Sequence, residues 1–128
     1  MYASFLFVIL FRLLSKNLIN AIKRVSIFSN RATKQITLTI TSKETIISTE
    51  DSEQSAKGIE KIESQFNDTG ERKIGFNSNF ILEALGNINK ENITMFLSGP
   101  LNAAILSETS QDKKTDKLVL LMPIRLND

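Results

Sequence analysis

The C-terminal segment Lys117-Leu-Val-Leu-Leu-Met-Pro-Ile-Arg-Leu126 is the most informative part of this chain, and only two residues follow it. The run up to Met122 is short and apolar, which is typical of a buried strand. Pro123 ends such a strand because it has no backbone N–H to donate. The segment therefore predicts a strand followed by a short tail at the very end of the sequence.

A helix followed by three strands occurs twice along the chain, and the C-terminal segment supplies the last of these strands. In residues 16–28 the apolar side chains Leu18, Ala21, Ile22 and Val25 recur with the spacing of one helix face. In residues 35–41, isoleucine and leucine alternate with threonine, which is typical of a strand with one buried face. We expect further strands at residues 45–49 and 58–66, then a second copy with a strand at 73–76, a helix at 78–87, and strands at 92–97, 103–108 and 117–122.

This order of elements predicts the fold class. A β-α-β-β-β unit that occurs twice gives an α+β domain, with two helices packed on one side of antiparallel sheets. At 128 residues the chain is long enough for a single domain with one core. We expect this domain at residues 16–128, after an atypical apolar segment at residues 1–15.

The atypical segment begins Met1-Tyr-Ala-Ser-Phe-Leu-Phe-Val-Ile-Leu-Phe11. It has no basic region before the apolar run, unlike a signal peptide, and it is shorter than the ~20 residues of a membrane span. Its β-branched and aromatic residues suit a buried first strand, or a strand with a frayed end. We favour the strand, and a misplaced start or a frameshift is the alternative origin.

The composition excludes several classes of function. The chain has no cysteine, histidine or tryptophan. Disulfides, thiolate or imidazole metal sites, and triads that need Cys or His are therefore excluded. No paired-acid or phosphate-loop pattern stands out, so we expect no catalytic activity, no metal and no cofactor.

Charge is segregated along the chain. Residues 12–34 carry six basic residues and no acid, whereas residues 43–72 carry eight acids against four basic residues. The basic segment could meet phosphates, and the acidic segment could meet a basic partner surface. The alternative is that both are ordinary solvated faces.

Three phrases, in this order and at this spacing, resemble a known family: Arg24-Val-Ser-Ile-Phe-Ser-Asn30, Ile74-Gly-Phe-Asn-Ser-Asn-Phe-Ile-Leu-Glu-Ala-Leu85 and the C-terminal segment. They are similar to the C-terminal third of the beta subunit of bacterial DNA polymerase III, the DNA sliding clamp. The resemblance covers about residues 17–127. It implies a DNA-clamp-like domain, with both helices on the DNA-facing wall of a ring and the sheets outside.

The resemblance also implies a partner-binding pocket. In the family, short peptides from polymerase, clamp-loader and repair proteins insert apolar side chains between this domain and the preceding one. Met and branched side chains suit varied peptides. Phe80 stands where the family often has tyrosine, so a hydroxyl contact is missing here. The alternative is that the last strand is simply core. The implied pocket residues are Asn77, Phe80, Leu101, Ala103, Leu120, Leu121, Met122, Pro123, Ile124, Arg125 and Leu126.

Two further surfaces follow from the resemblance. Ile27 and Phe28 match a hydrophobic pair at the subunit joint of clamp dimers, and the alternative for both is burial within the first helix. Carboxylates of the family face a basic edge across that joint, and the matching acids are Glu50, Asp51, Glu53 and Glu60. The candidates for non-specific, salt-dependent contacts to DNA phosphates are Lys16, Lys23, Arg24 and Lys90.

These observations favour a cytoplasmic, non-catalytic processivity factor of the replicative polymerase. Its expected partners are double-stranded DNA, peptide-bearing replication and repair proteins, and further copies in the full-length family, but no membrane. Family clamps have three such domains per subunit, so the chain resembles a fragment of one. The alternative is a small membrane-anchored or membrane-surface module that uses Met1–Leu14 as an anchor and the basic segment 12–34 beside it.

Overall fold

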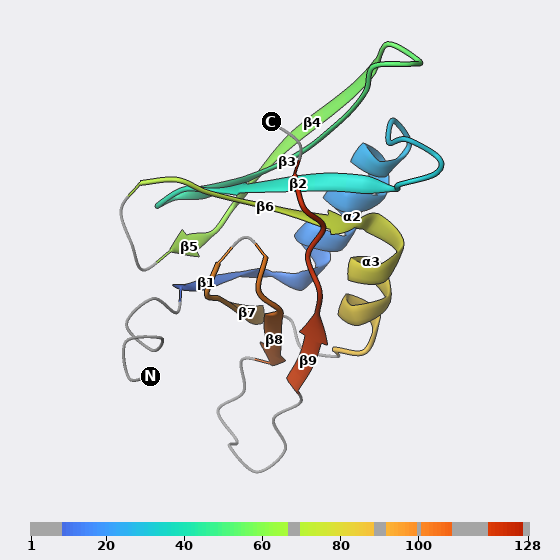
Figure 1. Ribbon diagram of the computed structural model, residues 1–128. Helices are drawn as coiled ribbons and strands as arrows, with labels where there is room; N and C mark the ends of the chain where they lie inside the picture. Colours follow the sequence, from blue (N-terminus) through green and yellow to red (C-terminus); the bar gives the residue numbers. More distant parts are fainter. Residues whose placement is uncertain (1–8, 67–69, 89–91, 100, 109–117, 127–128) are drawn as a thin grey trace.

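The computed structural model in Figure 1 describes residues 9–66, 70–88, 92–99, 101–108 and 118–126. The first half of the chain contains β1 (Ile9–Leu14), α2 (Ser15–Ser26), β2 (Gln35–Ile40), β3 (Glu44–Asp51), β4 (Ala56–Glu63) and the short β5 (Gln65–Phe66). The second half contains β6 (Arg72–Asn77), α3 (Ser78–Gly86), β7 (Asn92–Leu97), β8 (Ala104–Glu108) and β9 (Leu118–Leu121). The predicted α+β class and the repeated β-α-β-β-β order are confirmed.

The strands form two antiparallel sheets, with the orders β5-β1-β7-β8-β9 and β4-β3-β2-β6. β1 pairs with β7 from Ile9↔Leu97 to Leu14↔Asn92. β6 pairs with β2 from Gln35↔Asn77 to Ile40↔Arg72. Each half of the chain therefore places its first strand in the sheet of the other half. The helices α2 and α3 lie side by side and pack against the sheets (Figure 1).

The apolar positions predicted from periodicity form the core. The helical stripe of Leu18, Ala21, Ile22 and Val25 is buried, and so are the alternating residues of β2. Burying one such aliphatic side chain stabilises the fold by roughly 1.5–3 kcal/mol. Among the described residues, no buried side-chain nitrogen or oxygen lacks a hydrogen-bond partner.

The first helix is shorter than predicted. We expected it to reach Phe28, but α2 ends at Ser26. The amide of Phe28 donates to the carbonyl of Val25, and the amide of Ser29 donates to the carbonyl of Ser26. Each bond spans three residues rather than the four of an α-helix, so the chain tightens into a turn. Ile27 and Phe28 therefore lie beyond the helix, and their predicted alternative, burial within the helix, is wrong.

The strand predicted at residues 58–66 is interrupted. β4 belongs to the four-stranded sheet, whereas β5 pairs with β1 in the other sheet. The change of sheet occurs at Ser64, which is buried. Its amide bonds the carbonyl of Lys43 at 3.1 Å and its hydroxyl bonds that of Thr45 at 2.8 Å. Within β4, the exposed Ile59 and the half-buried Ile62 are three residues apart and so face opposite sides of the sheet.

The apolar N-terminal segment contributes a strand. Residues 9–14 form β1, which lies between β5 and β7, while residues 1–8 fall outside the described part of the chain. Within the described residues, no helix is long and apolar enough to cross a membrane.

Candidate partner-binding and subunit surfaces

The chain after β9 folds back along β6. We call residues 122–126 the tail. The backbone N–H of Ile124 donates to the carbonyl oxygen of Gly75 at 2.7 Å, and the two residues form an isolated antiparallel bridge. The tail thus runs beside β6, an edge strand of the four-stranded sheet.

Two antiparallel registers bring the predicted pocket residues together. The bridge between Gly75 and Ile124 carries the tail in the direction that takes Met122 toward Asn77 at the end of β6. The pairing of Ala104 with Leu121 likewise takes Met122 toward Ala103 and the turn before β8. Segments far apart in the sequence therefore meet around Met122.

Asn77 is the N-cap of α3. Its side-chain Oδ1 accepts hydrogen bonds from the amides of Asn79 at 2.9 Å and Phe80 at 3.2 Å. An N-cap of this kind satisfies amides that have no partner inside the helix. Asn77 therefore fixes the start of α3, and with it the position of Phe80 in the first turn.

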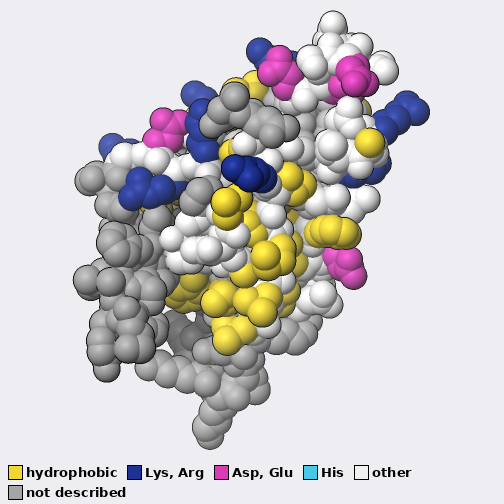
Figure 2. Space-filling model, in the orientation of Figure 1, with side chains coloured by type: hydrophobic (Ala, Val, Ile, Leu, Met, Phe, Trp, Pro, Cys, Tyr) yellow, Lys and Arg dark blue, Asp and Glu magenta, His cyan; other side chains and the backbone are white. Residues whose placement is uncertain are grey.

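The surface around the tail carries several exposed apolar side chains. Phe80 and Met122 are 61% and 64% exposed, and Leu101 and Leu120 are also exposed. Figure 2 shows hydrophobic side chains gathered on the face that carries α3 and the tail. Leu118 belongs to the same exposed set but was not predicted. The signal was present in the sequence, because Leu118 and Leu120 share one face of β9.

The other predicted pocket residues are partly or fully covered. Leu121 is buried in the core, so it can support the apolar surface only from below. Half-buried side chains are those of Asn77, Ala103, Pro123, Ile124 and Leu126, whereas Arg125 is exposed. We use the name tail surface for the exposed apolar set of Phe80, Leu101, Leu118, Leu120 and Met122.

Four of the six predicted subunit residues line one hollow, whereas Glu50 and Glu60 do not. Ile27 and Phe28 are 75% and 44% exposed, although core residues such as Ile22 and Leu38 are fully buried. Together with Asp51 and Glu53 they line a hollow of about 340 Å³. The ring of Phe28 lies over Gly58 of β4, where an added Cβ would be only 2.8 Å from Phe28 Cδ2.

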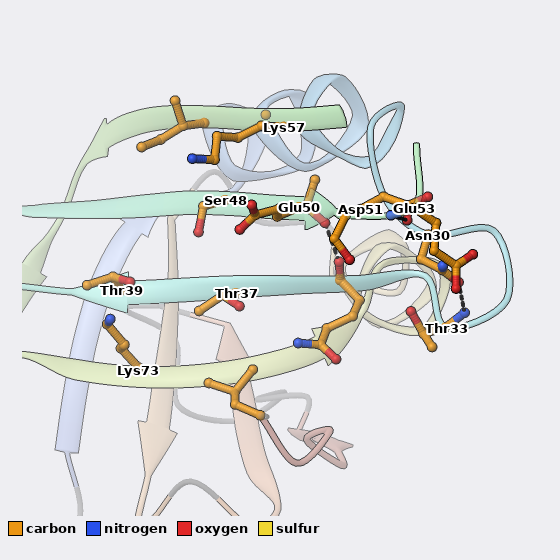
Figure 3. A pocket seen from close by; sticks show the side chains of 16 residues that line it. Asn30, Thr33, Thr37, Thr39, Ser48, Glu50, Asp51, Glu53, Lys57 and Lys73 are labelled. Carbon is orange, nitrogen blue, oxygen red and sulfur yellow. Dashed lines mark hydrogen bonds between the residues drawn. The ribbon is translucent and has the colours of Figure 1, made fainter. Parts of the chain in front are cut away.

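The acids of this region differ in their surroundings. Glu50 and Glu53 are exposed, whereas Asp51 is buried and its Oδ1 accepts from the amide of Glu53 at 3.2 Å. Figure 3 shows all three at one end of a shallow polar groove, beside the loop that carries Asn30 and Thr33. The groove crosses the outer face of the four-stranded sheet, where the side chains of Thr37, Thr39, Ser48 and Lys73 lie.

The predicted DNA-facing residues of α2 are exposed. Lys16, Lys23 and Arg24 all lie off the buried stripe, while Lys90 falls outside the described residues. Arg24, however, forms a two-pronged ion pair with Glu60 of β4, with Nε–Oε2 and Nη2–Oε1 distances of 2.6 and 2.7 Å. The predicted surfaces of these two residues differ: the DNA-facing wall for Arg24 and the subunit joint for Glu60. Within the chain, Glu60 binds Arg24.

This ion pair changes the titration of both groups. The hydrogen bonds from Arg24 lower the pKa of the Glu60 carboxyl, and Glu60 raises the pKa of the guanidinium. Since the folded-state pKa of Glu60 is lowered, its stabilising contribution is present above the unfolded-state pKa and is lost as pH falls through the folded-state pKa. The contribution is small because solvent screens an exposed pair.

We expect Glu60→Gln to reduce the pH dependence of stability in the acid range. Urea unfolding of the wild type and the variant, repeated at several pH values, should show a difference in midpoint that shrinks as the pH is lowered. Arg24→Gln is the matched control and should reduce the dependence similarly. Identical pH profiles for all three proteins would contradict the pairing.

The described geometry agrees with comparisons to known proteins. A family model for the DNA polymerase III beta subunit, C-terminal domain, matches residues 10–125. The solved structure of DNA polymerase III subunit beta from Pseudomonas aeruginosa is 27% identical, with a TM-score of 0.83 over 92% of this chain and 31% of that chain. The same values hold for the sliding clamp of that organism bound to griselimycin.

A more distant similarity is to the sliding clamp from Bartonella birtlesii bound to griselimycin. It is 21% identical, with a TM-score of 0.81 over 92% of this chain and 30% of that chain, and this similarity concerns the fold alone. Comparison with curated proteins gives no match. The chain spans about a third of the length of the solved clamps. With the match over residues 10–125, the chain belongs to the family of the C-terminal domain of the DNA polymerase III beta subunit.

Proposed function

We propose that this chain serves as the C-terminal domain of a sliding clamp, a cytoplasmic, non-catalytic processivity factor that holds the replicative polymerase on DNA. The observation that carries the proposal is the tail surface. Its five large apolar side chains are in contact with solvent, and hydrophobic side chains gather on the face that carries α3 and the tail (Figure 2). Exposed apolar patches of this kind are typical of sites that bind another protein.

The chemistry of the tail surface suits short apolar peptides. Met122 and the leucines are flexible and apolar, and Phe80 adds an aromatic side chain at the helix start. Such side chains can repack around different peptide sequences. We propose that peptides of polymerase, clamp-loader and repair proteins bind here, with the preceding domain of a full clamp supplying the other wall.

The remaining surfaces support assembly and DNA contact in the proposed clamp. The exposed pair Ile27 and Phe28, beside the acids of the hollow, suits an apolar joint between subunits with a charged rim. Lys16 and Lys23 on α2 suit weak phosphate contacts, which allow a clamp to slide. Arg24 contributes less in this proposal, because Glu60 neutralises it.

A peptide titration tests the proposed function. A fluorescent peptide with a clamp-binding motif, titrated into the chain, should bind weakly but measurably. Met122→Ala and Leu101→Ala should each weaken the binding by about tenfold, the effect of losing one interface contact of ~1.4 kcal/mol. Griselimycin, which the two clamps above bind, serves as a second probe.

Ile59→Ala is the matched control for this titration. Ile59 is 63% exposed, like Met122, but it lies on β4, at the opposite edge of the sheet from β6. Its substitution should leave the affinity unchanged. Peptide binding that survives both Met122→Ala and Leu101→Ala would place the binding site elsewhere and overturn the proposal.

A further inference from the structure

Gly75 lies in the interior of β6, where a glycine is expected to destabilise the strand. It lies between the buried residues Ile74 and Phe76 in the interior of a strand. Glycine weakens a strand because it packs no side chain and loses much conformational freedom on folding. Its backbone is not left-handed, since Gly70 is the glycine with positive φ among the described residues. The remaining reason for a glycine is steric: a side chain at this position would collide with a neighbouring segment.

The space above Gly75 is filled by the tail. A Cβ built at Gly75 would lie 2.5 Å from Leu126 Cδ2, 3.2 Å from Leu126 Cγ and 3.0 Å from the backbone oxygen of Ile124. The leucine side chain can rotate away from a methyl group, but the carbonyl oxygen of Ile124 cannot move unless the backbone moves with it. A glycine within a strand often marks such a close approach of a second backbone.

Met122 is held from both sides. Leu121 before it is buried and pairs with Ala104. After it, the amide of Ile124 donates to the Gly75 carbonyl and holds the tail against β6. Pro123 has a fixed φ and leaves few rotations between these two anchors. Displacing Ile124 therefore removes one of the two anchors that place the exposed Met122 side chain.

We propose that Gly75 is a positioning residue for the tail: the absence of a side chain there lets the tail lie on β6 and so places Met122 on the tail surface. The part of this inference that concerns peptide affinity rests on the proposed function. The part that concerns the tail does not. A side chain at residue 75 displaces the tail while the core beneath it stays folded.

The first measurement concerns the tail itself. In Gly75→Val, the hydrogen bond from the Ile124 amide to the carbonyl of residue 75 should break. Losing one backbone hydrogen bond should speed amide hydrogen exchange at Ile124 by about tenfold or more. Gly75→Ala should show a smaller change in the same direction. Amides of β2 and β7 should keep their protection. Gly86→Ala is the matched control, because nothing lies within 4 Å of a Cβ there.

The second measurement uses the double variant. Leu126→Ala removes the side chain nearest to the new group, so Gly75→Ala should speed exchange at Ile124 less in that background than in the wild type. Equal effects in both backgrounds would contradict the close contact. Unchanged exchange at Ile124 in Gly75→Val would overturn the inference, and so would equal loss of protection throughout the domain.

The third measurement links the tail to binding. Affinity for the labelled peptide should fall by about tenfold in Gly75→Val, with Gly86→Ala unchanged. If the wild type binds no peptide but exchange at Ile124 responds as expected, the proposed function fails and the role of Gly75 in placing the tail stands. If Ile124 exchange responds but peptide affinity does not, the link from Gly75 to the binding surface is wrong.

Discussion

Replacing Phe76 with alanine is expected to lower the free energy of unfolding by about 3–5 kcal/mol. Phe76 has no exposed surface and is among the largest fully buried side chains. It lies in β6 opposite Ile36, so its removal leaves a cavity where the two halves of the chain meet. A domain of this size has about 5–15 kcal/mol of stability in total, so the variant should be barely stable. Urea unfolding followed by circular dichroism measures the loss.

Phe80→Ala provides the matched control for this prediction. It deletes the same side chain four residues later, where 61% of it is exposed. We expect a loss of less than ~1 kcal/mol, because little buried surface disappears. The same variant should nevertheless weaken peptide binding, since Phe80 belongs to the tail surface. Equal losses of stability in the two variants would show that the burial at these positions is wrongly assigned.

The second large effect concerns the missing wall of the peptide site. Fusing this chain to the middle domain of a sliding clamp should raise its affinity for the labelled peptide by more than a hundredfold. Restoring only ~3 kcal/mol of contacts gives a change of that size. Isothermal titration of the peptide into the chain and into the fusion measures the difference.

The fusion needs a control for contacts made by the added domain alone. The same fusion with Met122→Ala and Leu101→Ala should lose most of the gain, because one wall cannot hold the peptide by itself. A fusion that binds no better than the lone chain would show that the tail surface is not half of a shared pocket.

Much of the fold could be predicted from the sequence, because its signals are local. The span of β7 is as predicted, residues 92–97, and the helical stripe from Leu18 to Val25 is buried as expected. The errors occur where partners distant in sequence decide the outcome. The break at Ser64 depends on bonds to Lys43 and Thr45, which periodicity within one segment cannot reveal.

The candidate site was less predictable for the same reason. The resemblance selected Asn77, but its use as the cap of α3 emerged only with the structure. Arg24 and Glu60 are 36 residues apart, and no local pattern links two long, flexible side chains at that distance. Gly75 lies in the segment 74–85 that carries part of the resemblance, yet the residues that it contacts, Ile124 and Leu126, lie at the other end of the domain.

The exchange of first strands between the two halves has a consequence for synthesis of the protein. β1 leaves the ribosome early, but its partner β7 follows only after β6 and α3. At typical translation rates this delay is on the order of several seconds. β2 must likewise wait for β6. Neither sheet can be completed until both halves have been made. A product that stops between the halves is therefore not a smaller, stable domain, because its strands have unpaired edges.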